Sequence, residues 1–303
     1  MSQSITPSLV DTLILFSVHR RLATKEELYH YQYQTTIPLE EISAVALAVP
    51  GVMYQDGMYG FEDEFEHLWK LRQEMDRETI RRYRKIRRYG KVLISIPYIR
   101  GIFVAGSLAF SSGNAKQGSD IDIFVVTAPN RIWLGRLGIT LMTQFLGIRR
   151  RGEYDENLFC LNHFVTEDNL YRGDHDIYSA ELYSDYIPVG AESVGTLQKF
   201  WETNAWRTDL YPQIRQRRYP LFAGITTWWG KRGIEKVLDI SGTAWLLTQW
   251  VRFLQKKKIT RNPLTRIESA RITATDTELE FHPYPNTIRI QERMKQRKHE
   301  RGL

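Results

Sequence analysis

The apolar and polar positions at the start of the chain have the spacing of three short helices. Apolar residues dominate residues 9–18, where we expect the first helix. Thr24 and Glu27 stand three positions apart, as in a capping box, where each side chain bonds to the other residue's backbone, so they predict the start of a second helix. Pro38 fits the first turn of a third helix, where proline is favoured because its missing N–H would have no helical partner.

A predicted hairpin completes a small N-terminal module. An Asp-Gly pair separates two strand-like runs within residues 52–61, which is a strong local signal for a hairpin. Three helices followed by a hairpin resemble a winged helix, a shape that often binds DNA through its third helix. That helix offers Glu40 and Glu41 but no Lys or Arg to phosphates and base edges. We therefore expect residues 1–62 to pack, or to bind a protein partner, rather than to read DNA.

A charged helix follows the module, and after it the spacing of apolar residues changes to that of strands. We expect residues 63–97 to form a charged linker helix that is interrupted at Pro97. Apolar runs at strand length then alternate with one helical run, in the order strand, strand, helix, strand, over residues 99–105, 121–126, 131–146 and 158–165. This order predicts an α+β core, a sheet covered by helices, over residues 98–190. One more helix is expected at its end, within residues 174–190 and before Pro188.

The last third of the chain is rich in tryptophan and reads as helical. We expect a helical C-terminal domain over residues 191–303, which ends in a basic tail. Residues 235–255 have apolar positions at helical spacing, and packing of this helix over the core sheet explains them. An interfacial helix on a membrane, with its flanking Lys and Arg, is the alternative.

Composition narrows the classes of protein. The chain has 303 residues, a net charge of +7 and one cysteine, Cys160, which excludes a disulfide framework and a cysteine-based zinc site. Cys160 lies in an apolar run and is interpreted as a small buried hydrophobe. The start of the chain lacks the pattern of a signal peptide, and no run of about 18 apolar residues predicts a transmembrane segment, so we expect a cytoplasmic protein. Basic blocks at residues 77–91, 256–258 and 293–301 are solvated helix faces or contacts for a nucleic acid.

The strongest candidate chemistry lies at the ends of the first two core strands. Gly106-Ser107 closes the first strand, and a small turn of this kind lets backbone N–H groups approach a phosphate. Asp120 and Asp122 open the second strand two positions apart, so their carboxylates project from one face. Two carboxylates so close repel unless a cation lies between them, and Mg²⁺ prefers such oxygen ligands. A turn or helix cap at Asp120 is the structural alternative.

This pairing of Gly-Ser with Asp-x-Asp resembles the nucleotidyltransferase superfamily related to DNA polymerase beta. The resemblance implies transfer of a nucleotidyl group from an NTP such as ATP to an acceptor that the sequence does not identify, with Mg²⁺ or Mn²⁺ bound by Asp120 and Asp122. It also implies that Gly106 and Ser107 hold the triphosphate. Two further candidates for contacts with the nucleotide lie in the loop between the motif's halves, Lys116 and Ser119.

The sequence departs from this family on the third core strand, which usually supplies another carboxylate. Asn162 stands at that position, and its neutral oxygen is a weaker ligand for Mg²⁺. Asp155 or Glu156 could supply the acid from the preceding loop, or Asn162 could serve an altered mechanism. His163 should face the other side of the sheet, because side chains alternate along a strand, and is expected to be structural.

Three functions therefore compete on the sequence. The first is a metal-dependent nucleotidyltransferase that uses Asp120, Asp122 and Asn162. The second is a nucleotide sensor with little or no turnover, whose N-terminal module passes a signal to a partner. The third is a nucleic-acid-binding protein that uses the basic blocks.

Overall fold

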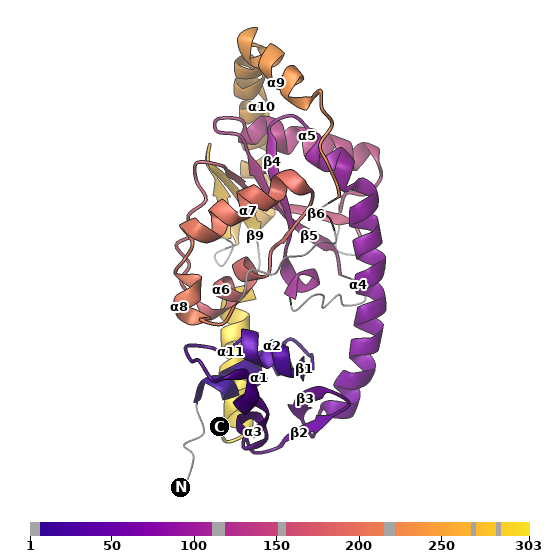
Figure 1. Ribbon diagram of the computed structural model, residues 1–303. Helices are drawn as coiled ribbons and strands as arrows, with labels where there is room; N and C mark the ends of the chain where they lie inside the picture. Colours follow the sequence, from indigo (N-terminus) through magenta and orange to yellow (C-terminus); the bar gives the residue numbers. More distant parts are fainter. Residues whose placement is uncertain are drawn as a thin grey trace.

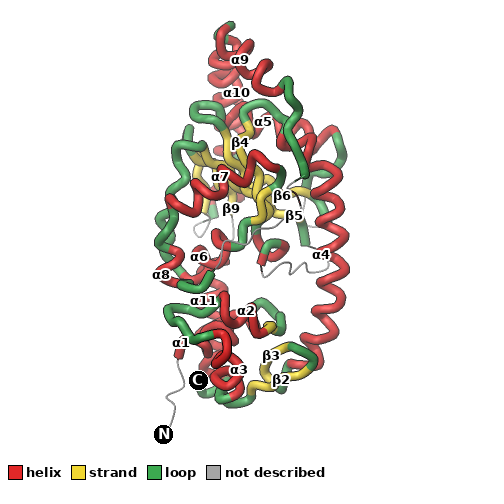
Figure 2. Tube along the Cα trace, viewed as in Figure 1, coloured by secondary structure: helices red, strands yellow, loops and turns green. Residues whose placement is uncertain are grey.

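The computed structural model describes residues 7–110, 119–150, 156–214, 222, 224–267, 271–282 and 286–303. A small N-terminal group of helices and a hairpin lies at one end of an elongated molecule (Figure 1). The larger part is a mixed sheet, whose strands Figure 2 shows between helices. The described chain is therefore α+β, as its pattern predicts.

The N-terminal elements follow the predicted order. They are α1 (Pro7–Val18), β1 (Ala23–Thr24), α2 (Lys25–His30), η1 (Leu39–Glu41), α3 (Ile42–Leu47), β2 (Val52–Gln55) and β3 (Met58–Phe61). The hydroxyl of Thr24 accepts from the amide of Glu27 at 3.1 Å, and the Glu27 carboxylate accepts from the amide of Thr24 at 2.8 Å. The capping box and the hairpin are thus confirmed. β1 adds a third strand, in the order β1-β3-β2.

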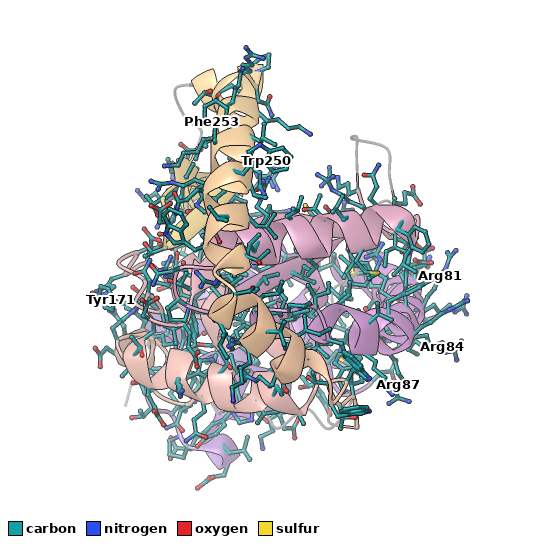
Figure 3. All side chains as sticks on the ribbon, turned by 90° about the horizontal axis from the view of Figure 1, so that it is seen from above. Arg81, Arg84, Arg87, Tyr171, Trp250 and Phe253 are labelled. Atoms are coloured by element: carbon teal, nitrogen blue, oxygen red, sulfur yellow. The ribbon has the colours of Figure 1, made fainter. Side chains whose placement is uncertain are left out.

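The charged helix α4 (Phe65–Ile94) is continuous over 30 residues and runs along one side of the molecule from the module to the core sheet (Figure 1). Its buried stripe includes Ile86 and Leu93, which pack against the sheet. Its exposed side carries arginines, three of which are labelled in Figure 3: Arg81, Arg84 and Arg87.

Six strands form the core sheet in the order β7-β4-β5-β6-β9-β8. Their bounds are β4 (Ile99–Val104), β5 (Ile121–Thr127), β6 (Phe159–Thr166), β7 (Ile187–Pro188), β8 (Arg271–Ala274) and β9 (Glu278–His282). β4 and β5 are antiparallel, whereas β5 and β6 are parallel and are joined through α5 (Ile132–Phe145). A crossover of this kind is required because parallel neighbours cannot be joined by a tight turn.

Helices cover both faces of this sheet. On one face, α4 and α5 pack against apolar side chains such as Val104 and Ile123. On the other, α7 (Ala191–Thr203) places Phe200 against Phe124 of β5, with ring centroids 5.6 Å apart. The alternation of Ile123 and Phe124 between the two faces explains why the strands are apolar throughout, as in other sheets covered on both sides.

The segment 174–190 contains the predicted helix, which ends before Pro188, and also a short strand that the sequence did not predict. It forms α6 (Ile177–Ser184) and then β7, which pairs antiparallel with β4. Asp176 caps α6 by accepting from the amides of Tyr178 and Ser179. Pro188 lies in the edge strand of the sheet, the position where a missing N–H is tolerated.

The last part of the chain is also less helical than predicted. Besides α7, its helices are α8 (Arg207–Leu210), α9 (Lys231–Ile240), α10 (Thr243–Thr260), η5 (Pro263–Arg266) and α11 (Asn286–Glu300). Between η5 and α11, β8 and β9 form a hairpin, and β9 pairs with β6. One sheet therefore includes strands from both sides of the predicted boundary at residue 190.

The basic tail is docked rather than free. α11 lies beside α1 in the N-terminal module, where its Ile290 and Met294 are buried. Arg301 pairs with Asp63 at 2.8 Å, and Lys298 pairs with Asp11. These contacts engage part of the positive charge of the tail within the protein.

Candidate functional site

The two halves of the Gly-Ser and Asp-x-Asp motif lie in contact. Gly106 and Ser107 form a turn, η2 (Gly106–Leu108), at the end of β4, and the amide of Ala105 donates to the carbonyl oxygen of Asp122 at 3.0 Å. Gly106 has a φ of +63°, and a Cβ there would lie 2.7 Å from Oδ2 of Asp122. Glycine is therefore required twice, by the left-handed backbone and by the approach of the carboxylate.

Asp120 and Asp122 point into the same space at the start of β5. Both are partly buried, and their carboxylate oxygens lie within 4.8 Å of each other and of the sulfur of Cys160. Cys160 pairs with Asp122 across β5 and β6, which brings its thiol beside the acids. It is only partly buried, so its interpretation as a buried hydrophobe was wrong.

The electrostatics of this group favour a bound cation. Burial, together with the negative charge of Asp120, raises the pKa of Asp122 to about 6, although His282 and Arg150 act in the opposite direction. Arg150 donates from Nη1 to Oδ2 of Asp120 and is itself only partly exposed. Arg150 thus supplies a positive charge at Asp120, while Asp122 has no comparable arginine contact among the described residues.

Asn162 contacts the site, but through its amide nitrogen. Nδ2 lies 3.4 Å from Oδ1 of Asp122 and 3.0 Å from Nε2 of His282. Nδ1 of His282 lies 2.9 Å from Oε1 of Glu280. The tautomer of His282 with its proton on Nδ1 would donate to Glu280 and accept from Asn162 at Nε2. Asn162 is therefore a hydrogen-bond donor here, and a ligand role would require its amide to turn.

His163 lies on the same face as Asn162, which corrects its predicted orientation. The pairing of β5 with β6 shifts register between Asp122 and Phe124, so Asp122 faces Cys160 and Phe124 faces His163. Such a bulge places one extra residue in a strand and reverses the alternation beyond it. The ring of His163 packs edge-on against Phe124 at 4.8 Å, and its Nε2 lies 3.0 Å from Glu278.

Glu278 and Glu280 form a second charged group beside the first. Together with His163 they bring ligand atoms within 4.8 Å of one another. The group is already neutralised: Arg172 contacts Glu278, and Arg271 donates from Nε to Glu280 at 2.9 Å. This arrangement is an ion-pair network behind the site rather than a second open site.

The remaining candidates have different outcomes. The hydroxyl of Ser119 accepts from Nη1 of Arg82 at 2.6 Å, which ties the start of β5 to α4. Ser107 is partly exposed in η2. Glu156 is exposed, and Lys116 and Asp155 lie outside the described residues.

Sequence analysis missed Arg150, His282 and Glu280. Arg150 lies between the core helix and the third core strand, and a single basic residue there does not form a recognisable motif. His282 and Glu280 reach the site because β9 pairs with β6, more than one hundred residues away in sequence. The alternation Glu278, Glu280, His282 was a usable strand signal, since three polar side chains two apart share one face.

The arrangement combines a glycine turn suited to a phosphate, two carboxylates suited to a hard cation, and an arginine suited to an anion. No family model, curated protein or solved structure matches the chain.

Proposed function

We propose that this protein is a metal-dependent nucleotidyltransferase of the polymerase beta-like type, which moves a nucleotidyl group from an NTP to an acceptor. The observation that supports the proposal is the contact of Gly106 with Asp122, because a glycine turn of the kind that can approach a phosphate lies directly against a carboxylate pair.

The donor set fits Mg²⁺ or Mn²⁺. Burial, together with Asp122 and Asp120, raises the pKa of the Cys160 thiol, and hard divalent cations prefer oxygen ligands to sulfur, so we expect Cys160 not to bind the ion. The available donors are then the oxygens of Asp120 and Asp122, which hard divalent cations prefer. A divalent cation held there supplies charge neutralisation for the triphosphate and activation of the attacking hydroxyl.

The residues of the chain bind and orient the nucleotide. Amides of η2 and the hydroxyl of Ser107 would bind phosphate oxygens beside Asp122. Arg150, which is partly exposed, can exchange its bond to Asp120 for one to a phosphate oxygen. The acceptor oxygen forms a bond to the α-phosphorus as the bond to the bridging oxygen breaks, and pyrophosphate leaves.

A nucleotide sensor is the second candidate, and two observations favour it. Asn162 does not present an acid, and His282 engages its amide. Phe110, two residues after η2, is buried in the N-terminal module, where His19 stacks on it with ring centroids 4.3 Å apart. A nucleotide that moved η2 would therefore act directly on the module.

Turnover and binding separate these two functions. We would measure pyrophosphate release from each NTP with Mg²⁺ or Mn²⁺, and nucleotide binding by calorimetry, for the wild type and for Asp120→Asn/Asp122→Asn. Exposed Asp168, just after β6, gives the matched control Asp168→Asn. Release that the double variant abolishes and the control retains supports the transferase. Metal-dependent binding without release supports the sensor, and equal behaviour of all three proteins rejects both.

A further inference from the structure

Helix α9 buries two of its charged residues and exposes its apolar side. Lys231 is buried and donates to the carbonyl oxygens of Ile94 and Ile99 at 2.8 and 2.6 Å. Glu235 is buried as well and accepts two bonds from Arg100, each of 2.9 Å. The outward side of α9 carries three exposed apolar residues: Ile234, Val237 and Ile240. A surface helix of a soluble domain has the opposite arrangement.

Helix α10 continues this apolar surface. Among its described side chains, only a narrow stripe is buried: Ala244, Thr248 and Val251. Six large apolar residues on it are exposed: Trp245, Leu246, Leu247, Trp250, Phe253 and Leu254. Figure 3 shows Trp250 and Phe253 projecting from this helix. Its packing on the core therefore explains only a minor part of the apolar stripe seen in the sequence.

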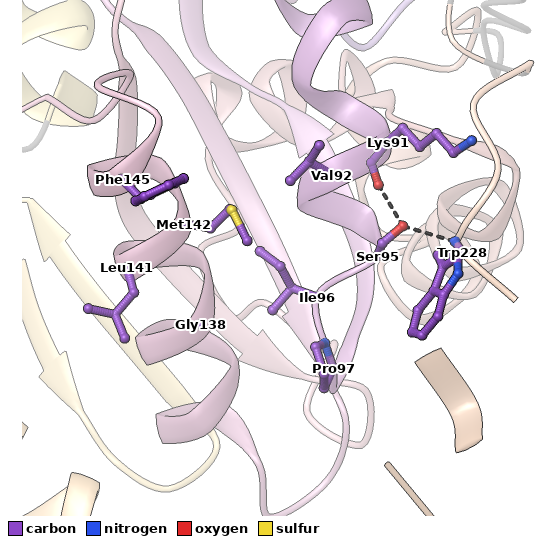
Figure 4. Close-up of a pocket in the computed structure, with 10 residues that line it drawn as sticks. All are labelled: Lys91, Val92, Ser95, Ile96, Pro97, Gly138, Leu141, Met142, Phe145 and Trp228. Carbon is purple, nitrogen blue, oxygen red and sulfur yellow. Dashed lines mark hydrogen bonds between the residues drawn. The ribbon is translucent and has the colours of Figure 1, made fainter. Parts of the chain in front are cut away.

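Further exposed apolar residues lie just before α9 and on α5, which packs against α10. Trp229, just before α9, is 89% exposed, and Phe145 at the end of α5 is 87% exposed. Between α4 and α5 lies an apolar cavity of about 680 Å³, lined in part by Ile96, Met142 and Trp228 (Figure 4). Many large apolar side chains exposed in one region mark a surface that a membrane or another molecule covers.

The charges around this surface are positive. α10 contains no acidic residue and ends in Lys256, Lys257 and Lys258, of which the last two are exposed. Lys236 is exposed on α9. The one exposed acid of α9, Asp239, accepts from Nη2 of Arg131 at 2.8 Å. An apolar face with tryptophans and a lysine border complements an anionic surface.

We infer that α9 and α10 dock the protein on an anionic lipid bilayer, with the apolar face in the headgroup region. Tryptophan is enriched at the membrane interface, and basic residues beside an amphipathic face bind anionic lipids. Lysine is depleted from protein–protein interfaces, which makes a second copy of the chain a poorer occupant for a face bordered by lysines. Among the described residues, no helix is both long and apolar enough to cross a bilayer, so the helices lie on the membrane.

Vesicle sedimentation of the full chain tests this inference. We expect binding to vesicles of phosphatidylcholine with phosphatidylglycerol, and weak binding to phosphatidylcholine alone. Trp245→Ser/Trp250→Ser/Phe253→Ser should weaken binding at least about tenfold, because these side chains would enter the headgroup region. Lys256→Gln/Lys257→Gln/Lys258→Gln should weaken it by about tenfold or more on the anionic vesicles only.

Two control variants test whether vesicle binding depends on α9 and α10 or on apolar residues and positive charge anywhere on the surface. Leu47→Ser/Ile80→Ser/Ile288→Ser removes three exposed apolar residues elsewhere, and Arg81→Gln/Arg84→Gln/Arg87→Gln removes three charges from α4. Both should bind like the wild type. Absence of binding to anionic vesicles, or equal losses in controls and test variants, overturns the inference. So does a dimer in light scattering that the Trp/Phe variant dissociates and that vesicles do not bind.

Discussion

Gly106, just after β4, lies against Asp122 of the antiparallel neighbour β5, and the space between them admits no Cβ. A side-chain carbon at residue 106 would lie 2.7 Å from the Asp122 carboxylate. This contact fixes the carboxylate against the backbone of η2, where we propose that a triphosphate binds.

Replacing Gly106 should therefore damage the site more than the fold. Gly106→Ala forces alanine into a left-handed conformation, at a cost of about 1–2 kcal/mol, and pushes the Asp122 carboxylate aside. Gly147 is a matched control, because its φ is +65° and a Cβ there meets nothing within 4 Å. We expect Gly106→Ala to lose at least as much free energy of unfolding as Gly147→Ala, measured in urea. Only Gly106→Ala should lose Mn²⁺-dependent nucleotide binding, and equal binding losses in the two would refute the role of the contact.

The Arg150–Asp120 ion pair should compete with metal binding. Arg150→Gln removes the positive charge from Asp120, so Mn²⁺ alone should bind about fivefold more tightly, while Mn²⁺ with NTP should bind less tightly. Titrations followed by the Mn²⁺ electron paramagnetic resonance signal would measure both. Arg149→Gln is the control that removes a neighbouring positive charge. It should change both affinities less than Arg150→Gln does. A weaker affinity of Arg150→Gln for Mn²⁺ alone would contradict the competition.

Asn162→Asp tests whether a third acid restores the expected metal chemistry. A carboxylate at 162 would lie beside Asp122, whose pKa burial and Asp120 already raise. The metal-free variant should lose about 1–3 kcal/mol of stability from this repulsion, and Mn²⁺ should recover it. Melting temperatures with and without Mn²⁺ measure the effect. Asn157→Asp, at an amide that accepts from Nε of Arg82, serves as the control and should show no recovery by Mn²⁺.

Local pattern was sufficient to predict the elements that build the motif. β4, β5, β6 and α5 lie within a few residues of their predicted bounds, because the strands are apolar runs of strand length and α5 is a longer apolar run of helical length. The placement of Asp120 and Asp122 together also follows from the strand period alone.

The pairing of distant strands and one β-bulge could not be predicted from the local sequence pattern. β9 joins β6 through pairs such as His163 with Glu280, and no local pattern in either strand specifies its partner. The bulge opposite Ile123 reverses the alternation in β6, so His163 turns to the face that the sequence assigned to Asn162 alone. The exposure of the apolar sides of α9 and α10 could not be predicted either, because periodicity identifies an apolar stripe but not what covers it.

Glu280 should make stability depend on pH. Burial alone would raise its pKa, but the hydrogen bond with His282 and the charges of His163 and Arg271 lower it to about 2. A carboxyl whose pKa is lower in the folded than in the unfolded protein stabilises the fold above its unfolded pKa, and this contribution is lost as pH falls toward the folded value. This lowering of the pKa corresponds to about 3 kcal/mol of the free energy of unfolding at neutral pH.

Glu280→Gln should therefore unfold more easily than the wild type at neutral pH, and the difference should shrink from about pH 5 to about pH 3 in urea titrations. Glu202→Gln, on the exposed side of α7, should differ little from the wild type throughout. If the deficit of Glu280→Gln stayed constant over this pH range, it would come from lost packing, and the charge of Glu280 would not be what holds His282 against Asn162.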